Sequence, residues 1–192
     1  MRIGGAFKHI CIEIKVNGSL IPWARSFTYL GIALKSATRF SVEMKPARAK
    51  FYRSFNSLYC KIYKANENLI SSLVHTFCVP IIMFGLEAFV LNTSSLHGLD
   101  APFYNVFAKI FKCHDRNILS WCMYYMDILP LRYVYFKNKI NFLSKMLKTG
   151  NDIVVSLFKL FGHDELVKLC ANFGNKHPTK LNLLEHFAST LT

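Results

Sequence analysis

The chain has 192 residues, of which 52% are hydrophobic, and its formal net charge is +13 at pH 7. This length predicts one domain with a real core, and the absence of internal repeats and low-complexity tracts excludes repeat arrays and compositionally biased chains. The excess of Lys and Arg indicates an anionic partner, such as nucleic acid or an acidic membrane surface, although a basic protein without such a partner stays an open alternative.

The N-terminal segment is expected to form strands. Ile10, Ile12, Ile14 and Val16 alternate with other residues, which predicts a half-buried strand, and Asn17-Gly18 directly after it is a strong hairpin signal. A return segment reaches residue 23, and residues 26–34 predict a further strand. Gly31 inside that strand indicates either a bulge or a close approach of the backbone to another group.

A long helix is expected from Pro46 to about Lys64. Its apolar stripe consists of Ala47, Phe51, Phe55, Leu58 and Ile62. The opposite stripe consists of Lys50, Arg53, Ser57, Lys61 and Lys64, and Tyr52, Tyr59 and Tyr63 follow one border. A row of cations without Asp or Glu, with aromatic rings beside it, suits the phosphate backbone of a duplex.

The longest apolar run of the chain lies at residues 69–91. Its length permits a transmembrane helix, but His75 and Glu87 interrupt it, and an ionisable group inside a membrane is costly. A core helix, kinked at Pro80 and buried on all sides, is the favoured interpretation because the neighbouring segments are nearly as apolar.

The remaining chain predicts more helices, so the fold class is mainly α, a helical bundle preceded by a small antiparallel β-hairpin. After a loop at residues 92–95, a helix is expected to start at Asp100 and Pro102. Another covers residues 131–148, and its exposed face is expected to carry Lys137, Lys139, Lys145 and Lys148. Gly162 is expected to separate two short helices at 152–161 and 164–173, and a linker leads to a last helix at 181–191.

No catalytic motif is found in the sequence. The acidic residues are single and dispersed, whereas phosphoryl transfer by a polymerase needs carboxylates that together hold two metal ions. Cys113, His114 and Cys122 do not match the ligand spacing of common zinc sites. The chain alone is therefore not expected to be a catalyst.

Short motifs along the chain resemble, in order and spacing, the reverse transcriptases of non-LTR (LINE-type) retrotransposons. Phe27-Thr-Tyr-Leu-Gly31 is similar to the Phe-x-Tyr-Leu-Gly segment that follows their palm. Cys78-Val-Pro-Ile-Ile-Met-Phe-Gly-Leu-Glu87 is similar to their Pro-x-x-x-Tyr-Gly-x-Glu signature, with Phe84 in place of the usual Tyr. Residues 50–56, 66–70, 129–131 and 138–147 are also similar, the last two to the helical tail of the jockey and chicken-repeat-like clades.

The resemblance implies that the segment with Tyr-Leu-Gly is a primer grip and that the helices after it form a thumb. Phe27, Tyr29, Leu30 and Gly31 would then position the primer end. The row of Lys50, Arg53, Lys61 and Lys64 comes from helical projection rather than from a family motif, and it is expected to follow the backbone of an RNA–DNA hybrid or of DNA. Pro80, Gly85 and Glu87 match the signature and are expected to be structural.

The catalytic palm of that family carries an aromatic-x-Asp-Asp metal site, which should lie before the hairpin. The nine residues before Ile10 contain no acid. The resemblance thus implies a fragment of an RNA-directed DNA polymerase that lacks fingers and most of the palm, with no cofactor of its own, since Mg²⁺ would be bound by the missing palm. Those missing parts would cover its excess apolar surface.

The same resemblance implies an intracellular protein of the nucleus or cytoplasm. It divides the chain into a palm remnant with the primer-grip-like hairpin (1–42), a helical thumb-like domain (43–150) and a C-terminal helical tail (151–192). Outside the resemblance, the alternative is a small basic membrane protein anchored by residues 69–91, although a membrane is not the expected partner.

Overall fold

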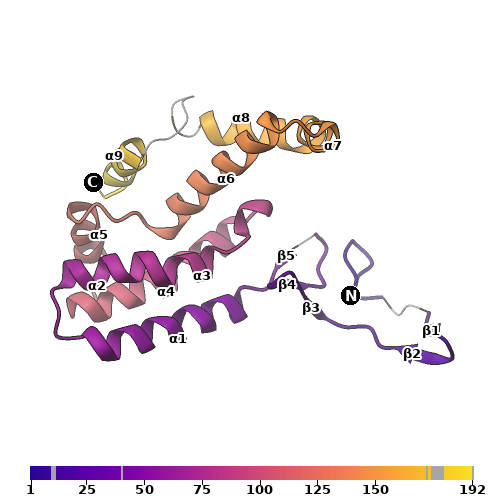
Figure 1. Ribbon diagram of the computed structural model, residues 1–192, viewed down its shortest axis with the longest axis horizontal. Helices are drawn as coiled ribbons and strands as arrows, with labels where there is room; N and C mark the ends of the chain where they lie inside the picture. The colour runs from indigo at the N-terminus through magenta and orange to yellow at the C-terminus, as the bar shows by residue number, and fades with distance from the viewer. Residues whose placement is uncertain (10–11, 40, 172, 174–179, 192) are drawn as a thin grey trace.

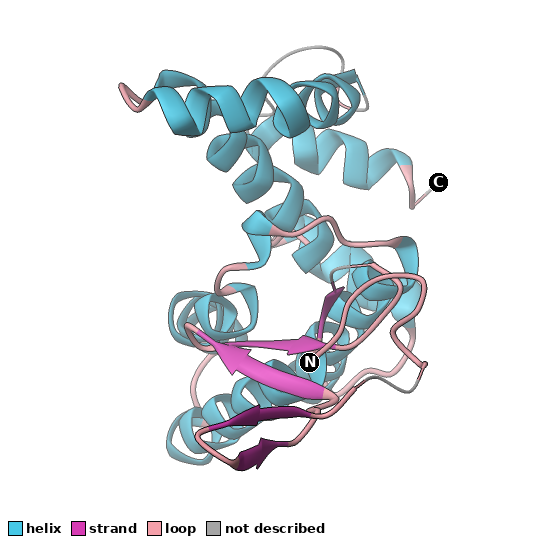
Figure 2. Ribbon diagram, turned by 90° about the vertical axis from the view of Figure 1, so that its right-hand side faces the viewer, coloured by secondary structure: helices cyan, strands magenta, loops and turns pink. Residues whose placement is uncertain are grey.

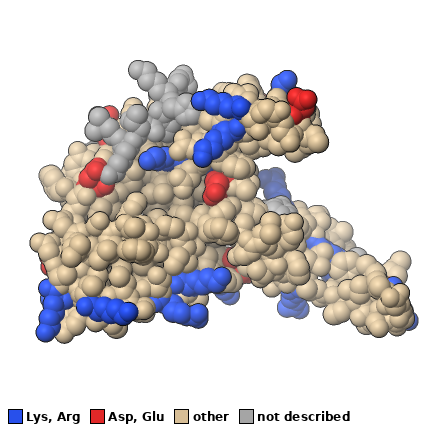
Figure 3. Space-filling model, viewed as in Figure 1, with Lys and Arg blue, Asp and Glu red and all other residues tan. Residues whose placement is uncertain are grey.

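A computed structural model describes residues 1–9, 12–39, 41–171, 173 and 180–191. An arm of short strands (residues 12–42) leads into a body of packed helices, the helical body (Figure 1). This confirms the expected mainly α fold preceded by antiparallel β-structure. The space-filling view shows the molecule hollowed between the arm and the helices at the far end of the chain (Figure 3).

The arm holds two antiparallel sheets (Figure 2). β1 (Ile14–Val16) and β2 (Ser19–Ile21) pair across the predicted Asn17-Gly18 turn, and both turn residues have positive φ. β3 (Ser26–Tyr29), β4 (Ile32–Lys35) and β5 (Ser41–Val42) form a three-stranded sheet in that order. The last of these strands leads directly into the first helix.

Two expectations for the arm are wrong. The β1–β2 hairpin has no buried face, because every residue of both strands is exposed, including Ile14 and Val16 on the side expected to be buried. Ile10, the first residue of the predicted alternation, lies outside the described residues. Residues 26–34 are not one strand either, because the chain reverses at Leu30 and Gly31, whose φ angles are +47° and +83°.

The core of the helical body is built from aromatic and aliphatic side chains of several helices. α1 (Met44–Ile62) buries Phe51 and Phe55, the centre of its predicted apolar stripe. α4 (Thr93–Phe111) buries Phe103 and Phe107, whose ring centroids lie 4.7 Å apart. α4 begins earlier than expected, since Asn92 caps it by accepting a hydrogen bond from the Ser95 backbone N–H.

Residues 69–91 form a continuous helix only as far as Met83. α2 (Glu67–Leu73), the π-helix η1 (Val74–Cys78) and α3 (Val79–Met83) run on without a break, because the residues at their junctions have helical φ and ψ. The helix expected to reach residue 91 therefore ends early, and the 3-10 turn η2 (Leu86–Ala88) is separate from it. One face is buried, including Ile70 and Val74, while Leu69 and Phe77 face solvent, so the run is not buried on all sides. Within the described part of the chain, no helix combines the length and apolarity that a membrane crossing requires.

α5 (Arg116–Tyr125), which the sequence analysis missed, leads to α6 (Leu131–Lys148). Lys139 of α6 is buried, against the expectation that it lies on the exposed basic face. Its Nζ lies 3.2 Å from the Glu165 carboxylate and donates to the carbonyl of Phe89 at 3.3 Å. Tyr135 donates to the same carbonyl at 2.7 Å, and burial raises its pKa to about 12.

The C-terminal helices pack back on α6. α7 (Asp152–Leu157), the π-helix η3 (Phe158–Gly162) and α8 (His163–Ala171) run on without a break, because Gly162 continues the helix instead of ending it. The predicted linker at residues 174–179 lies outside the described residues. α9 (Lys180–Ser189) then adds Leu183 and Phe187 to the main core.

Candidate nucleic-acid interface

The predicted basic row lies on the outer face of α1. Lys50, Arg53 and Lys61 belong to the helix, Lys64 follows its end, and all four side chains are exposed. In the space-filling view, Lys and Arg side chains gather along the edge formed by α1 (Figure 3). At 1.5 Å per residue, Lys50 and Lys61 are about 16 Å apart along the axis, which corresponds to roughly five base-pair steps of 3.4 Å.

Among the described residues, no member of the row forms an ion pair with a carboxylate. α1 contains neither Asp nor Glu. The ion pairs found among the described residues involve Arg132, Lys139 and His163, and none involves a member of the row. Uncompensated cations on one face produce a positive field and can release counterions when they meet phosphates.

The aromatic border of α1 is turned toward α4. Asn105 of α4 donates to the Tyr52 hydroxyl at 3.1 Å, and the Lys109 Nζ lies 4.9 Å from the Tyr59 ring centroid. Only the third ring, Tyr63, is exposed, with the Lys64 Nζ 5.7 Å from its centroid. Lys109 is thus a cation beside the basic row that helical projection of α1 alone could not reveal, because it comes from another helix.

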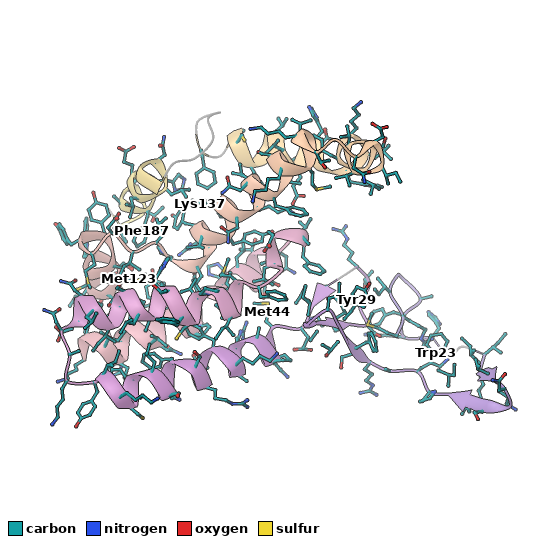
Figure 4. The ribbon with its side chains drawn as sticks, in the orientation of Figure 1. Trp23, Tyr29, Met44, Met123, Lys137 and Phe187 are labelled. Carbon is teal, nitrogen blue, oxygen red and sulfur yellow. The ribbon has the colours of Figure 1, made fainter. Side chains whose placement is uncertain are left out.

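The β3–β4 turn presents the other candidate residues. Phe27, Tyr29 and Leu30 are exposed, Leu30 to 76%. Leu30 and Gly31 are the two central residues of a tight turn between paired Tyr29 and Ile32. Because both have positive φ, the turn matches the type I′ geometry that favours a two-residue hairpin. Figure 4 shows Tyr29 where the arm approaches the helical body.

The turn packs against the segment after α3. A Cβ on Gly31 would lie 3.4 Å from Cε1 of Phe84, and a Cβ on Gly85 would lie 2.5 Å from Cδ1 of Ile32. The close approach requires a glycine at Gly85. At Gly31 a Cβ would make only ordinary contact, and the positive φ of the turn, rather than a close approach or the alternative bulge, is what favours glycine. The two motifs that carry the resemblance, distant in sequence, are neighbours in the fold.

A groove of about 350 Å³ is bounded by three parts of the chain: the β3–β4 turn, the N-terminal turns of α1, and α3 with the residues after it. It is mostly apolar, and Lys50 and Glu43 supply its charged groups. Of the predicted site residues the groove brings together Gly31 and Lys50. Phe27, Tyr29, Leu30, Arg53, Lys61 and Lys64 do not line it, so the turn and the basic row form one extended surface rather than one pocket.

The described residues contain no cluster of three or more His, Cys, Asp or Glu side chains that could hold a metal ion. Burial raises the pKa of Cys78, whose Sγ lies 3.5 Å from the Ser54 hydroxyl of α1, and it also raises the pKa of Asp100, Tyr133 and Tyr135 of α4 and α6. The exposed cations of the α1 face are suited to electrostatic contact with an anion.

Comparison of the chain with protein-family models, with curated proteins and with solved structures finds no match. The resemblance to reverse transcriptases consequently stays a prediction.

Proposed function

We propose that this chain binds nucleic acid, an RNA–DNA hybrid or a DNA duplex, without regard to sequence. The contact surface consists of the basic row on α1 and the β3–β4 turn beside it. In this proposal the chain is the primer-grip and thumb portion of a retrotransposon RNA-directed DNA polymerase, and the polymerase chemistry belongs to the missing palm.

The observation that carries the proposal is the exposed, uncompensated row Lys50, Arg53, Lys61 and Lys64 along one face of α1. Three cations spaced along α1 and a fourth just beyond its end can follow a phosphate backbone, and contacts to phosphates carry no sequence information. The turn supports the proposal because it exposes Tyr29 and Leu30 near the N-terminal end of α1, which is also where the groove lies.

The test is the salt dependence of binding. Fluorescence anisotropy with a labelled RNA–DNA hybrid is recorded between about 50 and 200 mM salt for the full chain and for the Lys50→Ala, Arg53→Ala, Lys61→Ala, Lys64→Ala quadruple variant. The variant is expected to bind more weakly, and its slope of log K against log salt should flatten by up to about 0.9 unit per lost phosphate contact.

A matched control removes the same charge elsewhere. Lys145, Lys148, Lys159 and Lys168 are exposed on the C-terminal helices, and their fourfold change to Ala lowers the net charge equally. This control should keep most of the affinity and of the slope. Equal losses of affinity in both variants would mean that binding depends only on net charge. An unchanged slope in the α1 variant would mean that the row does not contact phosphates and is only a solvated face.

A further inference from the structure

A second candidate site lies outside α1 and the arm, between α4, α5, α6 and α9. Two adjoining hollows of about 370 and 350 Å³ share the residues His97, Asp100, Arg132 and Thr190. Each falls in the range of roughly 300–1,000 Å³ that is typical of small-molecule sites. The proposed duplex contact uses none of these residues.

An ion pair between the buried Asp100 and the partly exposed Arg132 lies where the two hollows meet. Asp100 is 5% exposed, its Oδ2 lies 2.8 Å from Nε of Arg132, and its Oδ1 accepts the backbone N–H of Arg132 at 3.0 Å. Desolvation raises the pKa of Asp100, and the attraction of Arg132 opposes that rise. Within the described chain the Nη groups of Arg132 have no hydrogen-bond partner, so an oriented guanidinium keeps donors for a ligand.

A second guanidinium, that of Arg116, lines the hollow of about 350 Å³. Arg116 lies 5.3 Å above the Tyr104 ring, and the Tyr104 hydroxyl is in turn 3.0 Å from the Ser120 hydroxyl. The N-terminus of α5 is not the anion-binding group, because the Asp115 carboxylate already accepts its first free N–H groups. The two arginines therefore supply the positive charge, and together they exceed the single charge of Asp100.

Aromatic rings form the wall of the neighbouring hollow. Phe136 and Phe173 have ring centroids 5.7 Å apart, and His186 lies 5.4 Å from Phe173. His186 is held by the Tyr133 hydroxyl at 3.3 Å from its Nδ1. Such a wall suits a planar ring, which stacks on aromatic faces.

We propose that these hollows bind one nucleotide, with the phosphate between Arg116 and Arg132 and the base against Phe136 and Phe173. Guanidinium donors match phosphate oxygens in pairs, and Arg132 lies at the junction of the two hollows, where phosphate and base would join. The nucleotide is either free or the terminal residue of a strand. The inference is independent of the proposed duplex binding.

The test is calorimetric titration of the full chain with AMP, adenosine and inorganic phosphate. AMP is expected to bind saturably and more tightly than either part. Arg116→Ala should weaken AMP binding by about tenfold or more, since a charge-assisted hydrogen bond is lost, and should leave adenosine unaffected. Lys145→Ala, the loss of an exposed cation on α6, is the matched control and should bind AMP as the parent chain does.

Arg132→Ala is a weaker test, because it also removes the partner of Asp100. Arg116→Ala keeps the ion pair, and its circular dichroism spectrum and melting curve should match those of the parent chain. Absence of saturable AMP binding, an unchanged AMP affinity in Arg116→Ala, or equal affinities for AMP and phosphate would each overturn the proposal.

The α1 quadruple variant identifies the source of the nucleotide, because its duplex-binding row is removed. A 5′-phosphorylated oligonucleotide that displaces labelled AMP from this variant indicates a strand end, and one that does not indicates a free nucleotide. Retained AMP binding in this variant also separates the two proposals, since loss of duplex binding leaves the hollows intact.

Discussion

The arm and the helical body differ in how far their apolar side chains are exposed to solvent. In the body, Phe103 and Phe107 have no exposed surface. In the arm, Val16, Leu20 and Phe27 are exposed although they lie on paired strands. Figure 4 shows the same contrast, with Trp23 out on the arm and Met123 and Phe187 within the body.

The two regions consequently owe their shape to different causes. Burial of apolar surface holds the body together, whereas the arm depends on two tight turns, Asn17-Gly18 and Leu30-Gly31. A two-stranded hairpin alone is at best marginally stable in water. Under the proposed function, the β3–β4 turn contacts nucleic acid, and the exposed β1–β2 hairpin is where the rest of the polymerase would pack.

The largest expected effect is in the body. Phe107 is fully buried, and its ring centroid lies 4.7 Å from that of Phe103 and 5.9 Å from that of Phe111. Phe107→Ala removes these contacts and leaves a cavity, so we expect a loss of about 3–5 kcal/mol in the free energy of unfolding. Urea denaturation followed by circular dichroism measures it.

The matched change in the arm is Val16→Ala. Since half of the Val16 side chain already faces solvent, its truncation should alter the free energy of unfolding by no more than about 0.5 kcal/mol. Comparable losses for the two variants would mean that the arm is covered in solution, by a second copy or by the body itself, and would end the distinction between the regions.

An intermediate effect is expected where the body buries a charge. Glu165 of α8 neutralises Lys139, whose side chain is only 3% exposed, so Glu165→Gln leaves a buried cation with one carbonyl for a partner. Breaking a buried pair costs several kcal/mol, and because Glu165 itself is partly exposed we expect a loss of about 2 kcal/mol. Thermal and urea denaturation measure it.

A second substitution tests the cause. Lys139→Met in the Glu165→Gln background removes the unpaired cation while keeping an apolar stem of similar length. This double variant should regain most of the lost stability. If it stays as unstable as Glu165→Gln, the loss arises from the start of α8 rather than from the buried charge.

The sequence predicted the structure correctly where the periodic spacing of apolar residues matches their burial. The apolar stripe and basic row of α1 occupy opposite faces as helical spacing predicted, and the Asn17-Gly18 turn forms where expected. The extent of α4 could not be predicted because Pro102, a residue that usually marks a helix start, lies inside this helix. The burial of Lys139 depends on Glu165, which a pattern within α6 cannot show.

The turn at Leu30-Gly31 was hidden for a related reason. Leu rarely adopts positive φ, so the dipeptide lacks the usual signature of a two-residue turn, and the run from residue 26 to 34 has the appearance of one strand. The turn lies beside Phe84 and Gly85, which come more than fifty positions later in the chain. The arginines of the second candidate site were missed likewise, since α4, α5 and α6 must pack before they meet.

A loss smaller than that of Glu165→Gln is expected at this contact between the regions. Gly85 has φ +68°, and a Cβ there would lie 2.5 Å from Cδ1 of Ile32 in β4. Gly85→Ala should cost about 1–2 kcal/mol, because a side chain is disfavoured in the left-handed region and Ile32 must move. Gly150→Ala is the control, since a Cβ at Gly150 would meet no atom within 4 Å. Equal stability of the two variants in urea denaturation would show that the turn does not depend on the helical body for its position.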